Sequence, residues 1–152
     1  MLSDVERFWK KAWRSVGEDA PKEPPQAWAF GDTPELANEL LALVLVGRKT
    51  ATADALWRFE FDEEPLPEPG DLSIVLDGFG WPHAVIETTE VRVMPMHEVD
   101  EQFAYDEGEG DRSRDYWLSA HERYFSRTLP EIGREFDPVM PLVLERFRLR
   151  YP

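Results

Sequence analysis

The sequence predicts one α+β domain, built on a small and mostly antiparallel sheet or barrel with helices packed around it. Residues 34–46 and 113–127 carry apolar residues at helical spacing, whereas 84–93 and 143–151 alternate between apolar and polar residues as half-buried strands do. The chain has 152 residues, which is enough for a single compact core. We therefore expect residues 1–152 to form one domain.

The first 27 residues are expected to form a helix and a proline-rich connection. Ser3 or Asp4 is suited to cap a helix that runs to about Val16, and Gly17 is expected to end it. The connection, residues 18–26, contains three prolines and is too short to separate two domains.

A short strand at 28–30 and a second helix are expected next. Thr33 is a good cap, Pro34 suits the first helical position, and Gly47 is placed to end the helix. Residues 48–52 would then follow a buried helix end, which holds their backbone firmly.

The middle of the chain is expected to supply strands. Residues 53–61 are ambiguous between helix and strand, and the three prolines within 65–70 indicate a rigid loop. A short strand at 72–76, a turn at 77–80 and a longer strand at 84–93 follow.

The last third of the chain is expected to contain two helices and a final strand. Residues 98–105 look helical, and Ser113 is suited to cap a helix that ends near residue 127. The polar side of the strand 143–151 carries three arginines, which we expect to pair with surface carboxylates: Arg146, Arg148 and Arg150.

Composition limits the classes of function. The chain has 31 acidic and 17 basic residues and a net charge of −14, which argues against nonspecific binding to a long polyanion such as DNA. It has no cysteine, so disulfides and thiolate metal sites are excluded. No apolar run approaches the roughly 20 residues that span a bilayer, and the N-terminus does not resemble a signal peptide. We expect a cytoplasmic protein without a membrane partner, and its oligomeric state is left open.

Two polar segments carry residues suited to chemistry. Gly47-Arg48-Lys49-Thr50-Ala51-Thr52 places a lysine beside hydroxyls at the end of an apolar helix, and Glu107-Gly108-Glu109-Gly110-Asp111 is a glycine-rich acidic loop. A lysine amine in a dry cleft can act as a base, an anion binder or a proton donor.

Taken in order along the chain, these segments resemble the ASCH domain family, and most closely its longer bacterial subgroup with the Glu-Gly-Glu-Gly-Asp motif. The resemblance covers roughly residue 28 to the C-terminus, so we divide the domain into an N-terminal extension, 1–27, and an ASCH core, 28–152. It implies a PUA-like β-barrel flanked by helices. Further segments support it: Pro65-Leu66-Pro67, Gly70-Asp71, residues 85–91, Trp117 and His121.

The resemblance implies that the cleft binds single-stranded RNA or a cytidine-like nucleoside. Some family members are similar to ribonucleases, and others are amidohydrolases that deacetylate N4-acetylcytidine. The working lysine, threonine and glutamate of the amidohydrolases match Lys49, Thr52 and Glu107. The sequence departs from them in the residues after Glu107 and at Ala53-Asp54, where they have an arginine. We therefore expect hydrolysis of RNA, with nucleoside amide hydrolysis and non-catalytic binding as the alternatives.

Each predicted catalytic residue has two readings. Lys49 is either the base or the electrostatic catalyst, and Thr52 is either the nucleophile or a positioning hydroxyl. Glu107 either orients Lys49 or acts as an acid–base partner whose pKa is raised by acidic neighbours. The substrate-binding candidates are Arg48, Thr50, Trp57 as a stacking platform, Glu109 and Asp111.

No cofactor or bound metal is predicted. The alternative left open is a magnesium or manganese ion held by Glu107, Glu109 and Asp111, because oxygen ligands suit these ions. His121 lies on an apolar helix face and is interpreted as a hydrogen-bonded core histidine.

Overall fold

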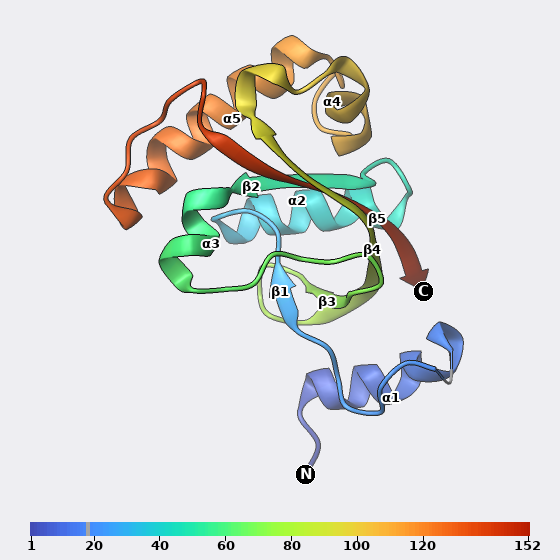
Figure 1. The fold of residues 1–152 in the computed structure, drawn as a ribbon. Coiled ribbons are helices and arrows are strands. Elements are labelled where there is room, and N and C mark those ends of the chain that lie inside the picture. The colour runs from blue at the N-terminus through green and yellow to red at the C-terminus, as the bar shows by residue number, and fades with distance from the viewer. Residues whose placement is uncertain (18) are drawn as a thin grey trace.

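The computed structural model describes residues 1–17 and 19–152, and in this part of the chain helices surround one five-stranded sheet (Figure 1). Glu18, the first residue of the expected proline-rich connection, lies outside the described residues. The elements follow in the order α1 (Asp4–Val16), β1 (Ala27–Ala29), α2 (Pro34–Leu45), β2 (Ala51–Ala55), α3 (Leu56–Asp62), β3 (Leu72–Leu76), β4 (Pro82–Pro95), η1 (Met96–Glu98), α4 (Glu101–Glu107), α5 (Arg114–Thr128), η2 (Leu129–Ile132) and β5 (Pro141–Tyr151).

The sheet has the strand order β1-β3-β4-β5-β2. Strand β1 pairs with β3 in parallel and every other pair is antiparallel, which confirms a mostly antiparallel sheet. The long strands β4 and β5 form its centre, and their pairing shifts register twice, between Val85 and Ile86 and between Thr88 and Glu90. Within the described residues β1 and β2 are the two edges, so the expected sheet is present but the strand pairing does not close it into a barrel.

Helices cover the sheet through three apolar clusters. Helix α2 packs Leu41 and Val44 against Val75 and Ile86 of the sheet. Helix α5 and the end of β4 form a second cluster around Trp117, and α1 forms a third on the other side of the molecule (Figure 1). The sheet is therefore the common scaffold on which all the helices depend.

Most of the expected helix ends are confirmed. The Ser3 side chain accepts from the Glu6 amide in a capping box, and the Thr33 and Ser113 side chains cap α2 and α5. The ambiguous segment 53–61 divides at Ala55, where β2 ends and α3 begins.

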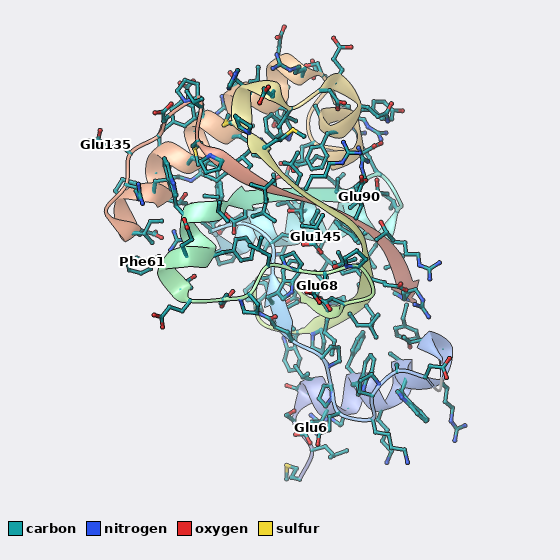
Figure 2. All side chains as sticks on the ribbon, viewed as in Figure 1. Glu6, Phe61, Glu68, Glu90, Glu135 and Glu145 are labelled. Atoms are coloured by element: carbon teal, nitrogen blue, oxygen red, sulfur yellow. The ribbon has the colours of Figure 1, made fainter. Side chains whose placement is uncertain are left out.

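The arginines of β5 form the expected ion pairs. Arg148 and Arg150 both contact Glu87 on the neighbouring strand, and Arg146 contacts Glu90 and Asp106. Glu145 of the same strand is half-buried and points into the molecule, whereas Glu6 of α1 is exposed and points outward (Figure 2). The arginines are thus occupied by the protein's own carboxylates.

The end of α2 is joined to the end of α4, about 60 residues later in the sequence. Gly47 adopts a left-handed φ of 78°, and the Arg48 and Lys49 amides both turn back to the Leu43 carbonyl. The Thr50 amide then donates to the Asp106 carbonyl at 2.8 Å. These contacts hold the two polar segments side by side.

Gly108 allows this close approach. It ends α4 with a φ of 76°, and a Cβ at this position would lie 2.4 Å from the Arg48 carbonyl oxygen. A side chain therefore meets both an unfavourable backbone conformation and a backbone clash.

None of the described helices is long and apolar enough to cross a membrane.

We predict that Gly108→Ala destabilises the protein much more than Gly133→Ala. Both glycines have φ near 75°, but a Cβ at Gly133 meets nothing within 4 Å. The left-handed conformation alone costs roughly 1–2 kcal/mol, and the clash at Gly108 adds about 1–3 kcal/mol. Urea unfolding of the two variants measures the difference, and equal losses of stability would contradict the tight contact with Arg48.

Candidate functional site

Lys49 is buried at the centre of the site. Its side chain is 2% exposed, although it follows directly after a helix end. Its Nζ atom lies 3.4 Å from the Glu107 carbonyl oxygen and 5.5 Å from the centre of the Phe30 ring. An amine in such a position is kept away from bulk water.

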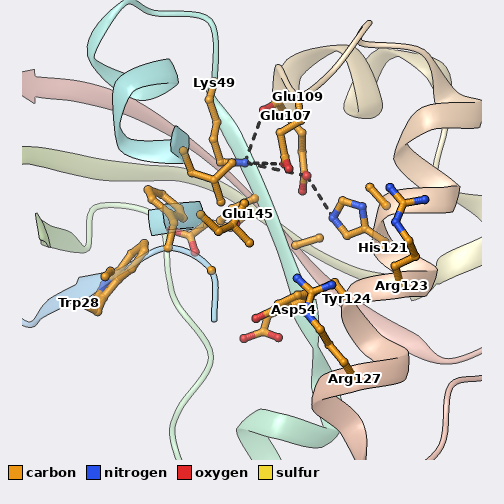
Figure 3. Close-up of a pocket in the computed structure, with 18 of the residues that line it drawn as sticks. Trp28, Lys49, Asp54, Glu107, Glu109, His121, Arg123, Tyr124, Arg127 and Glu145 are labelled. Atoms are coloured by element: carbon orange, nitrogen blue, oxygen red, sulfur yellow. Dashed lines mark hydrogen bonds and ion pairs between the residues drawn. The ribbon is translucent and has the colours of Figure 1, made fainter. Parts of the chain in front are cut away.

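Two carboxylates face this amine. The Lys49 Nζ atom lies 3.4 Å from Oε2 of Glu109 and 3.9 Å from Oε2 of Glu107 (Figure 3). Glu107 is the last residue of α4 and is 1% exposed, whereas the side chain of Glu109 in the following loop is 22% exposed. Glu109 is therefore the carboxylate with the easier access to a ligand.

His121 of α5 completes the cluster. Its Nδ1 atom lies 2.8 Å from the Trp117 carbonyl oxygen, which can only accept, so Nδ1 carries a proton. Its Nε2 atom lies 3.2 Å from Oε2 of Glu107, and its ring stacks on Trp117. His121 is hydrogen-bonded in the core as expected, but it also belongs to the candidate site.

The surroundings separate the proton affinities of the two carboxylates. Burial alone would raise the pKa of Glu107, but Lys49 and His121 outweigh it and lower the pKa to about 2. Burial and the Glu107 anion raise the pKa of Glu109 above its usual value. The expectation of a raised pKa for Glu107 is therefore wrong, and Glu109 is the one of these two carboxylates whose pKa is raised.

The pKa of His121 is raised as well. Burial opposes the positive charge, but Glu107 outweighs this effect through its charge and its hydrogen bond. Among the described residues Oε1 of Glu107 and Nε1 of Trp117 are buried without a hydrogen-bond partner. The cluster is thus strongly charged, and its central carboxylate is incompletely satisfied.

The cluster opens into a partly enclosed cavity of about 490 Å³. Thr52 and Asp54 of β2 and Glu145 of β5 belong to the lining, and Thr52 lies directly opposite Glu145 in the sheet. Trp28 lines the side of β1, and Tyr124 lines the side of α5 (Figure 3). A cavity of this size fits a small ligand such as a nucleoside.

The cavity lining is rich in carboxylates. Five of its residues are Asp or Glu and three are Lys or Arg. Burial raises the pKa of Asp54 and of Glu145, and together with nearby Asp54 it raises the pKa of Tyr124 to about 12. These groups suit hydrogen bonds to an uncharged ligand better than contact with several phosphates.

Two of the predicted substrate-binding residues, Arg48 and Thr50, contact the backbone that supports the site and not the cavity. The Arg48 side chain donates to the Gly108 and Gly110 carbonyls, and the Thr50 hydroxyl lies 3.4 Å from the Asp106 carbonyl oxygen. Neither side chain lines the cavity described above. Both instead hold the acidic loop against the lysine segment.

Trp57 and Asp111 lie away from the cavity. Trp57 of α3 packs against the core around α5, with the guanidinium of Arg134 over its ring. Asp111 is exposed and accepts from the Ser113 amide. Trp28, not Trp57, lines the cavity, and the pairing of β1 with β3 holds Trp28 in the sheet.

The residues that could hold a metal ion also differ from the alternative that the sequence left open. Among the described residues Glu107, Glu109 and His121 each offer one ligand atom, and these atoms lie within 4.8 Å of one another. His121 takes the place of Asp111. The sequence alone did not indicate that His121 lies beside Glu107 and Glu109, because only the tertiary packing of α5 brings it there.

The comparisons with known proteins agree with the fold. The ASCH domain family model matches residues 26–151. The crystal structure of EF3133 from Enterococcus faecalis V583 is 40% identical with a TM-score of 0.88, over 98% of this chain and 89% of that one. The ASCH domain from Lactobacillus crispatus JV V101 is 33% identical with a TM-score of 0.90, over 100% and 97%.

A more distant structure shares the fold only. The hypothetical protein PH0355 is 14% identical, with a TM-score of 0.54 over 82% of this chain and 99% of that one. A comparison with curated protein sequences gives no significant match.

We predict that the imidazole of His121 titrates above pH 6.5, because Glu107 stabilises its charged form. The stabilisation from this pair is fully present below pH 6.5 and is lost as pH rises through the raised pKa. Histidine NMR resonances measure the titration, and Glu107→Gln should lower the midpoint. A midpoint at or below 6.5 in the wild type would contradict the described contact.

Proposed function

The chain belongs to the ASCH domain family, and we propose that it is a hydrolase that removes an acyl group from a small nucleoside-type amide. The observation that carries this proposal is the buried Lys49 amine, which lies at a partly enclosed cavity beside two carboxylates. The pKa of Glu107 is lowered and that of Glu109 is raised. These are the parts that amide hydrolysis needs: a positive charge for the developing oxyanion and a group that moves protons.

The cavity favours a small substrate over a long RNA strand. Its volume of about 490 Å³ suits one nucleoside, and its excess of carboxylates opposes a chain of phosphates. Trp28 and Tyr124 offer aromatic surfaces for a base. Asp54 and Glu145 offer acceptors for amino and hydroxyl groups.

Each residue of the cluster has a role in this reaction. Lys49 stabilises the negative charge that develops on the amide oxygen. Glu109, whose pKa is raised, takes the proton of the attacking hydroxyl and returns it to the leaving nitrogen as the C–N bond breaks. Glu107 stays ionised between Lys49 and His121 and holds both in place.

In this proposal Thr52 supplies the attacking hydroxyl. It is the second residue of β2 and lines the same cavity as Lys49 and Glu109. Attack transfers the acyl group to the threonine oxygen, and water then releases the acid. Thr52→Ser keeps a hydroxyl and should keep turnover, whereas Thr52→Val has the same shape without it. Full turnover in Thr52→Val would assign the attack to water instead.

Cleavage of RNA, which the sequence favours, is the second candidate. Arg123 and Arg127 of α5 line the cavity, and both are exposed enough to meet a phosphate. Arg127 is already paired with Asp32, which leaves Arg123 as the main anion contact. Binding without turnover is the outcome that would remain if both reactions are absent.

We predict that Lys49→Met lowers kcat/KM on N4-acetylcytidine by about 100-fold or more, because it removes the charge that meets the oxyanion. Lys10→Met makes the same change on the exposed face of α1 and should have no effect. Acetate release from the nucleoside and cleavage of single-stranded RNA are measured side by side. RNA cleavage that depends on Lys49, without acetate release, would establish the second candidate.

Glu109 gives a separate test that leaves the contact between Lys49 and Glu107 in place. We predict that kcat/KM rises with pH through a midpoint above 4.5, because Glu109 must be ionised to accept a proton. Glu109→Gln should abolish turnover while it keeps substrate binding in calorimetry. An unchanged pH profile in this variant would assign proton transfer to another group.

A further inference from the structure

We propose that Glu107, Glu109 and His121 also form a binding site for a divalent transition-metal ion such as Zn²⁺ or Mn²⁺. The three residues come from the end of α4, the following loop and α5, and their ligand atoms lie within 4.8 Å of one another. The site shares residues with the proposed hydrolase, but metal binding does not require that activity. It can therefore be tested without substrate.

His121 is oriented as metal-binding histidines are. Its Nδ1–H donates to the Trp117 carbonyl at 2.8 Å, and its Nε2 atom faces Glu107, where a bound ion would replace the Nε2 proton that Glu107 stabilises. A hydrogen bond from one ring nitrogen to a backbone carbonyl is the usual support of a histidine whose second nitrogen binds a metal. Stacking on Trp117, with ring centroids 4.0 Å apart, fixes the ring further.

Glu107 is an incompletely satisfied buried carboxylate. It is 1% exposed, and its Oε1 atom has no hydrogen-bond partner among the described residues. Its Oε2 atom is 3.9 Å from the Lys49 amine, longer than the roughly 2.7–2.9 Å of a charge-assisted hydrogen bond. A cation bound to this carboxylate would complete its coordination.

The distances fit a small ion after a modest movement. Ligand atoms about 2.0–2.2 Å from a tetrahedral ion lie roughly 3.3–3.6 Å apart, and Nε2 of His121 is already 3.2 Å from Oε2 of Glu107. The three ligand atoms lie within 4.8 Å of one another, and Glu109, the most exposed of the three residues, is the one that can adjust most easily. One imidazole and two carboxylates suit Zn²⁺ or Mn²⁺ better than Mg²⁺ or Ca²⁺.

Lys49 competes with the ion for the same carboxylates. Its ammonium lies 3.4 Å from Glu109 and 3.9 Å from Glu107, so a divalent ion has to share or displace this charge. Removing the amine should therefore strengthen metal binding. The same change abolishes the proposed hydrolysis, so the two proposals predict opposite effects of one substitution.

Calorimetry and Mn²⁺ electron paramagnetic resonance on the untagged, chelator-treated protein test the site. We expect one Mn²⁺ or Zn²⁺ per chain, at least tenfold tighter than Mg²⁺. Glu109→Gln and His121→Ala should each weaken binding at least tenfold, and Lys49→Met should tighten it several-fold. Asp111→Asn is the matched control, because it removes a carboxylate of the same loop that lies outside the cluster.

Absence of saturable binding, or binding that Asp111→Asn weakens as much as Glu109→Gln does, would show that the cluster is not a metal site. Unfolding temperatures with and without the ion confirm that the variants are folded. Because no substrate is present, failure here leaves the hydrolase proposal intact, and loss of turnover alone leaves the metal site intact.

Discussion

The structure depends on one junction, where the segment after α2 meets the segment after α4. The Thr50 amide donates to the Asp106 carbonyl, and Arg48 donates to two carbonyls of the glycine-rich loop. This junction places Lys49 against the acidic loop, although the two segments are about 60 residues apart. Without it the buried lysine would lose its counter-charges, and a buried unpaired charge is strongly destabilising.

The junction also explains why the site is charged and yet buried. The carboxylate of Glu107 lies close to both Lys49 and His121, and these opposite charges compensate part of the cost of desolvation. Three ionisable groups can therefore be buried together. The cost is that their proton affinities become interdependent. The pKa of Glu107 is lowered, whereas the pKa of Glu109 in the following loop is raised. The two neighbouring carboxylates therefore differ in the pH at which they exchange a proton.

The sequence predicted the element types well because capping residues and alternation act locally. Ser3, Thr33 and Ser113 cap the helices that were expected. Ala53–Phe61 stayed ambiguous because its strand part is rich in alanine and only pairing with β5 decides its state. Lys49 and Glu107 were identified by the resemblance to a family. The positions of His121 and Trp28 in the cavity lining were not expected, because tertiary packing alone brings them there.

The excess of carboxylates in the cavity lining affects the release of an acidic product. Hydrolysis of an amide converts an uncharged substrate into an acid that ionises at neutral pH. Asp54, Glu109 and Glu145 then repel the product that the same cavity has formed. On the proposed function the electrostatic field of the cavity favours release of the acid, so product inhibition by the free carboxylate would be weak.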